Sequence, residues 1–439
     1  MGIQSRKTDP NLYILFDYTK AGNLKKKGFH KGIIFALAFL GFSRGFGFAL
    51  NKGFTFPLLS QFTESALIRG LVLSLQGLMG FLIPILLGYM SDTYRSEHGR
   101  RKPFILAGGC LGGIFAVMIY TSFTLGAQLW LFTIVVAIFY FAMYSYVSQF
   151  RALLPDLIPS GDRGKASGFI TLAEWAGNLV LFGASAYLIA TFVWGQFSMF
   201  LLTGVFLIAA SIFTFLKIKE PRMSGSTPSQ TLISYLKSVF KDQNFLNFYA
   251  AQMLLWISYQ LVAVFLFGIA AYILKGDASS ASVDEVHSFG LFARAAFNFP
   301  VLGGSLSGGY IYDKIGRRIS IIAGAVVFGL PLTLGWFVET RLQMLIALLV
   351  AGIGWGAVLA GSLPVVGDLL TQYKREAFNG RYYGVFAATR ALPVLIASAV
   401  GGLIVDLAGN NYRLLFPISA VLIWISIPLI WSLKELEEE

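Results

Sequence analysis

One stretch of the chain recurs roughly half a chain length later, and each copy stands between two long apolar runs. GYMSDTYRSEHGRRKPF, at residues 88–104, returns in compact form as GGYIYDKIGRRIS, at residues 308–320. Both copies contain a Gly, an Asp four residues later, and then Gly-Arg-Arg. A second repeat agrees with the first, because Asp156 and Asp368 are each followed by a glycine twelve residues further on. These two repeats predict a chain built from two related halves.

The apolar runs are too long and too many for a water-soluble fold. Of the 439 residues, 56% are hydrophobic and only 13% are charged, with a mean hydropathy of +0.69. A spanning helix needs about 20 apolar residues, and backbone groups in lipid must be bonded within the segment. We therefore predict an all-α polytopic membrane protein with twelve transmembrane helices. The runs lie near residues 32–52, 66–91, 103–123, 127–154, 168–191, 197–216, 245–274, 287–311, 319–338, 342–369, 382–407 and 414–433.

Twelve spans divide into two six-helix halves, with three connecting or terminal segments. The first half covers residues 32–216 and the second covers residues 245–433, with a tail at 1–31, a linker at 217–244 and an acidic tail at 434–439. The linker begins with Pro, Gly, Ser and Thr and ends in an amphipathic stretch. We expect that stretch to lie along the membrane surface, and a regulatory element is the alternative.

The basic residues predict the orientation of the chain. The net charge is +12, but most of the 34 Lys and Arg residues stand in the N-terminal segment and in every second loop. By the positive-inside rule, both termini are expected in the cytoplasm, with the plasma membrane as the expected location. This topological pattern accounts for the basic balance, so we expect no nucleic-acid partner.

Several other classes of protein are not supported by the residues. The single Cys110 permits no disulfide within the chain, and the three His residues have no metal-ligand spacing. No Walker loop is present, so ATP is not the expected energy source. We expect no cofactor, no metal and no enzymatic activity. Glycine pairs at helical spacing indicate close packing between helices of one chain, so a monomer is expected.

Charged residues are distributed unevenly among the predicted spans. An ionisable side chain in hydrocarbon costs at least about 2.5 kcal/mol and usually faces a bundle interior or a watery cavity. The third, sixth, ninth and twelfth spans contain none in their interiors. We therefore expect these four spans to face lipid, while the other eight surround a polar path between the halves.

The two Gly-Asp-Gly-Arg-Arg loops resemble the signature of the major facilitator superfamily, and the twelve-span plan extends this resemblance over nearly the whole chain. Residues 88–104, RALLPDL at 151–157 and AGN at 176–178 more narrowly resemble the glycoside-pentoside-hexuronide:cation symporters and the sucrose:proton symporters. The resemblance implies secondary active transport by alternating access.

The sequence departs from that narrower group at two places. Members of the sucrose branch usually carry a carboxylate about three turns before the Arg of RALL, whereas residues 137–150 contain no acid. Family members also often have an Arg two residues before Gly-Arg-Arg, where this chain has Glu97. The usual sucrose and proton site is therefore not reproduced.

Carboxylates and arginines at the predicted cytoplasmic loops are expected to act as gates. Charge-assisted hydrogen bonds between them can close one face and break when the halves move apart. The alternative is that these charges serve topology alone. The gating set is Asp92, Arg100, Arg101, Asp156, Asp313, Arg317, Arg318 and Asp368.

Glu174 is the only carboxylate well inside a predicted span, and Arg151 is at comparable depth on the preceding span. A carboxylate in a cavity can take up and release a proton as its access to water changes. We therefore predict that Glu174 and Arg151 couple transport to an ion. A permanent Glu174–Arg151 ion pair is the alternative, and the two readings are compatible if the pair opens during transport.

Arginines without an acid at the same depth are expected in the substrate cavity. A buried guanidinium needs an anion or other polar partners, so it favours either an anionic substrate or a site with water, carbonyls and sugar hydroxyls. We expect the second. The predicted cavity residues are Arg44, Asn51, Gln76, Asn178, Trp256, Gln260, Arg294, Asn298 and Arg390.

These observations predict a secondary active transporter that moves a sugar or glycoside together with a proton or Na⁺. An organic-anion carrier for a hexuronate or other carboxylate is the alternative within transport. A non-transporting receptor or assembly factor on the same fold is the alternative outside it. Nothing in the sequence decides between import and export.

Overall fold

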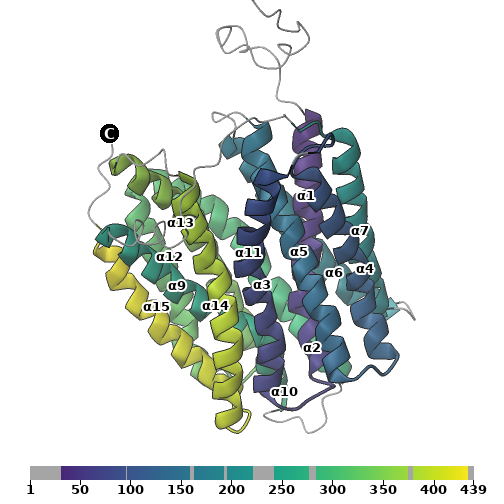
Figure 1. The fold of residues 1–439 in the computed structure, drawn as a ribbon. Coiled ribbons are helices and arrows are strands. Elements are labelled where there is room, and N and C mark those ends of the chain that lie inside the picture. Colours follow the sequence, from purple (N-terminus) through teal and green to yellow (C-terminus); the bar gives the residue numbers. More distant parts are fainter. Residues whose placement is uncertain are drawn as a thin grey trace, which may run out of the picture.

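The computed structural model describes residues 31–94, 96–158, 163–191, 195–220, 242–275, 283–373 and 379–433. All regular secondary structure in these ranges is helical (Figure 1). The amphipathic part of the predicted linker and the acidic tail lie outside the described residues, as does the N-terminal tail up to residue 30.

The first half contains six long helical segments. The first begins as α1 (Lys31–Leu50), continues through the π-helical turn η4 (Asn51–Thr55) and ends with α2 (Phe56–Leu59). It is longer than the predicted span at 32–52, because the helix continues through the π-helical turn. The others are α3 (Ala66–Thr93), α4 (Lys102–Thr124), α5 (Leu129–Leu157), α6 (Arg163–Thr191) and α7 (Gly195–Lys217).

The second half repeats the arrangement with one helix broken. The break separates α9 (Gln243–Val264) from α10 (Leu266–Lys275), whose axes differ by 49°. There follow α11 (Val283–Ile315), α12 (Arg317–Leu334), the 3₁₀ turn η6 (Gly335–Phe337), α13 (Arg341–Gln372), α14 (Asn379–Leu407), the 3₁₀ turn η8 (Tyr412–Leu414) and α15 (Leu415–Trp431).

Among the described residues, nine helices are long and apolar enough to cross a membrane, and the bent pair α9 and α10 makes ten. The two remaining predicted spans correspond to α6 and α11, which contain the inward-facing charges Glu174 and Arg294 and are less apolar. The prediction of an all-α membrane protein is confirmed.

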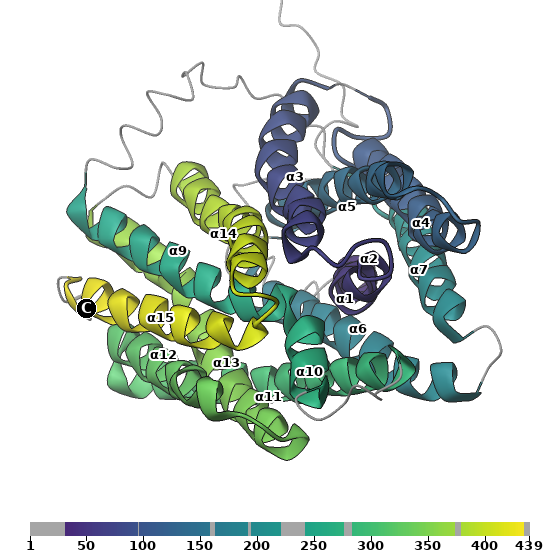
Figure 2. The same ribbon diagram turned by 90° about the horizontal axis from the view of Figure 1, so that it is seen from below.

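The two halves lie side by side as separate helix groups (Figure 2). Helices α4 and α7 are at the edge of the first group, and α12 and α15 are at the edge of the second. These are the third, sixth, ninth and twelfth predicted spans, so their peripheral position agrees with the expected contact with lipid.

Helices α3 and α14 join the halves through glycines. A Cβ atom at Gly70 would overlap the carbonyl oxygen of Ser398, and one at Gly77 would overlap the amide nitrogen of Leu395. The two backbones therefore touch along the start of α3. Figure 1 shows that α3 and α14 separate toward the end of the bundle at which α1 begins. We call this the basic end, because both Gly-Arg-Arg loops lie there, and we call the other the opposite end.

Candidate functional site

Close packing of α1 on α6 positions the central charges. Gly41 and Gly45 are four residues apart on α1, so they share one face of the helix. A Cβ atom at Gly45 would overlap the carbonyl oxygen of Glu174, and one at Gly177 would overlap that of Phe42. Because no side chains separate these backbones, Arg44 lies directly opposite Glu174.

Arg44 and Glu174 form an ion pair between their Nη1 and Oε2 atoms. Arg44 is buried, whereas the Glu174 side chain is 22% exposed. A permanent Glu174–Arg151 ion pair was the alternative reading of the sequence, and in the structure Glu174 pairs with Arg44 instead. The reason is the contact between α1 and α6, which a list of residue depths does not reveal.

Arg151 on α5 and Arg390 on α14 complete a charge cluster with this pair. Each interacts electrostatically with both Arg44 and Glu174. Within the described part of the chain, neither arginine has an ion pair or a hydrogen bond. The Arg390 guanidinium lies 4.7 Å from the ring centre of Phe386 and 5.1 Å from that of Trp256. Three arginines thus surround one carboxylate.

Two members of this cluster have exposed surface. Arg151 is exposed in the described structure, and the Glu174 side chain is 22% exposed.

A hydrogen-bonded polar group lies further along the first span. Asn51 Nδ2 donates to Gln76 Oε1 at 2.7 Å, and the hydroxyl of Tyr140 donates to Asn51 Oδ1. Asn51 is in the π-helical turn η4, and such turns frequently mark functional sites. The structure therefore brings Asn51 and Gln76 together, with Tyr140 as a third member that the sequence did not single out.

Arg294 contacts both irregular helices. Its Nη2 donates to the carbonyl oxygen of Lys52 in η4, at 3.3 Å, and to that of Ala263, one residue before the end of α9. The side chain is only 1% exposed. Arg294 thus supplies donors to carbonyls at the two places where the helical pattern changes. Its predicted contact with substrate stays a prediction.

Lys52 is a charged residue of the first span that the sequence reasoning missed. Its Nζ donates to the hydroxyl of Tyr259 on α9 at 3.1 Å, so it joins the two halves. Lys52 is the last residue of the predicted span at 32–52, so the prediction put it at the membrane surface. The continuation of the helix through α2 brings it inside.

The other predicted cavity residues have separate settings. Asn178 Nδ2 donates to the carbonyl oxygen of Glu174 at 3.0 Å, and Trp256 lies beneath Arg390. Gln260 and Asn298 are buried, at 5% and 7% exposure. The predicted set is therefore divided between the charge cluster and the packed interior.

At the basic end, the first Gly-Arg-Arg loop is bound to α5. Asp156 accepts from Arg100 Nη2 at 3.0 Å and from Arg101 Nε at 2.5 Å. Glu220, after α7, accepts from the backbone nitrogen of Arg101 at 2.9 Å. This arrangement connects the ends of α5 and α7 to the start of α4.

The second half has the corresponding contact. Arg317 forms an ion pair with Asp368 on α13, and Arg318 donates to the carbonyl oxygen of Leu433 at 2.9 Å. Both repeats detected in the sequence thus meet in space, each within its own half. The side chains of Asp92 and Asp313, at the ends of α3 and α11, lie outside the described part.

The opposite end is closed by a contact across the halves. Asp406 on α14 accepts from the backbone nitrogen of Ala66 at 2.6 Å, from that of Leu67 at 3.1 Å and from the Ser65 hydroxyl at 2.5 Å. Nearby, Arg69 Nη2 donates to the hydroxyl of Tyr412 at 2.8 Å. A carboxylate at a helix N-terminus is favourable because it satisfies free N–H groups. The sequence analysis did not identify Asp406.

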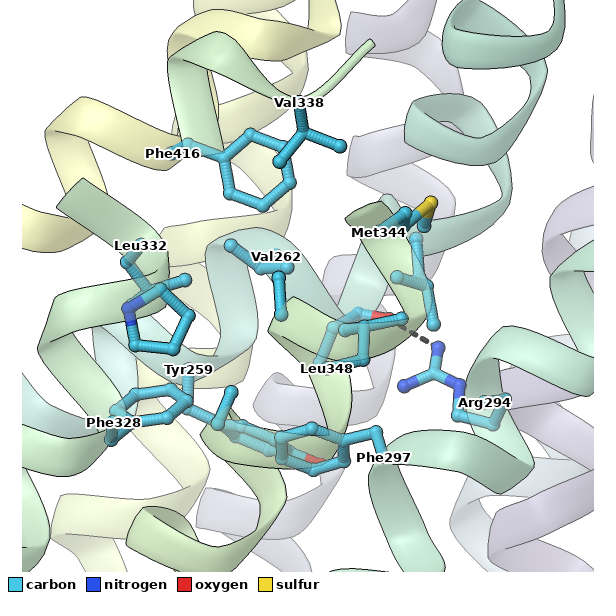
Figure 3. A pocket seen from close by; sticks show the side chains of 15 residues that line it. Tyr259, Val262, Arg294, Phe297, Phe328, Leu332, Val338, Met344, Leu348 and Phe416 are labelled. Atoms are coloured by element: carbon cyan, nitrogen blue, oxygen red, sulfur yellow. Dashed lines mark hydrogen bonds between the residues drawn. The ribbon is translucent and has the colours of Figure 1, made fainter. Parts of the chain in front are cut away.

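An apolar cavity lies within the second half (Figure 3). Its wall is formed mainly by side chains of α9, α11, α12 and α13, and Arg294 lies at its edge with a guanidinium nitrogen bonded to a backbone oxygen. This cavity is separate from the charge cluster, since none of Arg44, Arg151, Glu174 and Arg390 lines it.

The helix arrangement agrees with a comparison of the sequence with family models. The model described as Major Facilitator Superfamily matches residues 37–283, which is more than half of the chain. The chain belongs to the major facilitator superfamily. It is therefore a multi-pass membrane transporter and not an enzyme.

Curated relatives match only part of the chain. Multidrug transporter protein MdtP of Bacillus subtilis is 32% identical over 111 residues, 25% of this chain and 19% of that protein. Myo-inositol transporter 3C of Cryptococcus neoformans var. grubii is 28% identical over 176 residues, 38% of this chain and 28% of that protein. The matched regions span between about a fifth and three tenths of these relatives' own lengths.

Solved structures match almost the whole chain in fold. A D-xylose-proton symporter has a TM-score of 0.70 and 14% identity, covering 93% of this chain and 98% of that one. The nucleoside transporter NupG has a TM-score of 0.67 and 15% identity, covering 91% and 98%. An inward-facing, occupied bacterial homologue of the lysosomal transporter Spinster has a TM-score of 0.67 and 13% identity, covering 91% and 95%. These likenesses establish the fold.

Proposed function

We propose that this transporter couples the movement of a small polar solute to a proton through the Arg44–Glu174 ion pair. The observation that supports it best is the partly exposed carboxylate of Glu174, which pairs with Arg44 and interacts with Arg151 and Arg390. The charged groups described beside Glu174 are guanidiniums, which offer no oxygen ligand to Na⁺, whereas a proton needs only the carboxylate itself.

The proposed transport cycle opens the two ends of the bundle in turn. In this structure the opposite end is closed by Asp406 and by the contact of α3 with α14, while Arg151 is exposed. Rocking of the halves would break the first contacts and close the basic end. Glu174 would then exchange its proton with each side in turn. The basic end is proposed to be cytoplasmic, in the plasma membrane.

A sugar or glycoside is the proposed solute, as the resemblance to the glycoside-pentoside-hexuronide and sucrose symporters implies. Support comes from the partial match to a myo-inositol transporter and from aromatic and amide side chains beside the cluster, including Trp256 and Asn178. Such side chains stack on sugar rings and bond hydroxyls. Anionic members of this class are considered below.

The test measures proton movement that depends on solute. Purified protein is reconstituted into vesicles that contain a pH-sensitive dye, and candidate sugars, glycosides and sugar acids are added outside without an imposed gradient. We expect the interior pH to fall when a transported solute enters, and a protonophore to abolish this pH change. Solute entry that leaves the interior pH unchanged, and that a Na⁺ gradient drives instead, would contradict proton coupling.

A further inference from the structure

The charge cluster has more positive than negative groups. Arg44, Arg151 and Arg390 share one carboxylate, Glu174, so the four described side chains carry a net charge of about +2 when all are ionised. Inside a protein the attraction between opposite charges is stronger than in bulk water, so an anion bound here would gain from this excess. A neutral solute would leave this excess in place.

The two arginines outside the ion pair are the ones positioned for a ligand. Arg151 belongs to the first half and Arg390 to the second, so a group bound between them would contact both halves. The Nε atom of Arg390 is buried and has no hydrogen-bond partner in the described chain. The planar fork of a guanidinium fits carboxylate and phosphate oxygens.

Protonation of Glu174 changes the same balance. When Glu174 takes up a proton, its carboxyl group becomes neutral and its ion pair with Arg44 is lost, so the cluster gains one net positive charge. An anion then binds more strongly. Because linkage is reciprocal, the bound anion also favours uptake of the proton by Glu174. The geometry therefore supplies a reason why proton and anion would travel together.

We propose that the substrate is an anion, a solute with a carboxylate or phosphate group held between Arg151 and Arg390, whose binding is strengthened when a proton on Glu174 releases Arg44. This inference rests on the proposed function and specifies its substrate class. It reverses our expectation from the sequence of a neutral solute, because the carboxylate described in the cluster, Glu174, is paired with Arg44.

The binding test uses three probes that differ at one position: glucose, glucuronate and glucose 6-phosphate, with succinate and inorganic phosphate as smaller anions. The full chain in lipid nanodiscs is titrated with each probe at an acidic and at a neutral pH, and calorimetry or ligand-dependent thermal stability gives Kd. We expect at least one anion to bind more tightly than glucose, and more tightly at the acidic pH. The preferred probe distinguishes carboxylate from phosphate.

Variants test the assigned residues. Arg151→Gln and Arg390→Gln should each weaken binding of that anion by about ten- to a hundredfold, since each removes hydrogen bonds to a charged group. If Arg151→Gln does not fold, Arg151→Lys replaces it, because lysine keeps the charge but loses the fork. Arg341→Gln is the matched control. Arg341 is exposed, and it pairs with Glu285 rather than with any residue of the charge cluster. Glu174→Gln should bind the anion equally well at both pH values.

Binding of glucose as tightly as its anionic counterparts, no binding by any of the anions, or unchanged affinity in both arginine variants would overturn the proposal. These failures are distinct from failure of proton coupling. A neutral solute carried with protons would overturn only the anionic substrate, whereas an anion carried without protons would overturn only the coupling.

Discussion

Individual arginines inside the spans of this protein are stabilised in different ways. Arg44 has a carboxylate, Arg294 has two backbone carbonyls, and Arg390 has two aromatic rings. The sequence identified all three as charges inside spans, because charges in long apolar runs are easily seen. It could not assign their partners, because these depend on how each helix is rotated against its neighbours.

Arg294 gives the prediction at this scale. Arg294→Gln should lower the free energy of unfolding by about 2 to 4 kcal/mol, because two charge-assisted hydrogen bonds to carbonyls at the irregular turns are lost. Thermal or denaturant unfolding in detergent measures it. Arg341→Gln, which removes an exposed ion pair, should change stability by under about 1 kcal/mol. Equal effects of the two substitutions would show that Arg294 does not hold these turns.

At the scale of the helix, glycines decide which helices touch. Close contacts at Gly45 and Gly177 bring α1 onto α6, and those at Gly70 and Gly77 bring α3 onto α14. Spacing of glycines by three intervening residues, as at Gly41 and Gly45, was a signal for the first contact. This spacing indicates that the first span packs closely against another helix, but it does not say against which one.

Two glycines on the same helix α6 test this contact. Gly177→Ala should destabilise the protein by about 1 to 3 kcal/mol, because the added methyl group overlaps the backbone of α1. Gly183→Ala has no atom within 4 Å of the new Cβ and should be neutral or stabilising by up to about 1 kcal/mol. Unfolding in detergent compares them. A destabilisation of the same size at both positions would argue against close packing of α1 on α6.

For the whole molecule, the duplication was the feature that the sequence revealed most fully. The repeated loops and the two equivalent aspartates predicted two halves, and the structure pairs Arg100 and Arg101 with Asp156 and pairs Arg317 with Asp368. The contacts between halves were not predicted. They join residues such as Ser65 and Asp406, which are far apart in the chain and have no counterpart in the repeat.

Asp156 and Asp368 have equivalent positions in the two halves, so we expect their substitutions to have similar effects on transport. Asp156→Asn and Asp368→Asn each weaken the ion pair that connects a Gly-Arg-Arg loop to the adjacent helix. We expect either substitution to slow transport with little change in substrate affinity, since neither residue belongs to the charge cluster. Uptake rates and Kd in the same preparation measure both. Large losses of affinity with normal turnover would place these residues in the binding site instead.

Closure of the opposite end should depend on Asp406. Asp406→Ala removes the acceptor for the N-terminus of α3 and should raise the population in which this end is open. Spin labels at Leu125→Cys on one half and Leu342→Cys on the other, with Cys110 replaced by Ala, report the separation, because both leucines are exposed at that end. A distance distribution that does not lengthen would show that the glycine contacts alone keep it closed.

Proton coupling through Glu174 is the central claim, and one comparison tests it most directly. Glu174→Gln is reconstituted into vesicles and assayed for net uptake under an imposed proton gradient and for exchange of labelled against unlabelled substrate. Exchange requires the binding site but no net proton movement, so we predict that exchange persists while accumulation is abolished. Accumulation against a gradient at the wild-type level in Glu174→Gln would contradict the account.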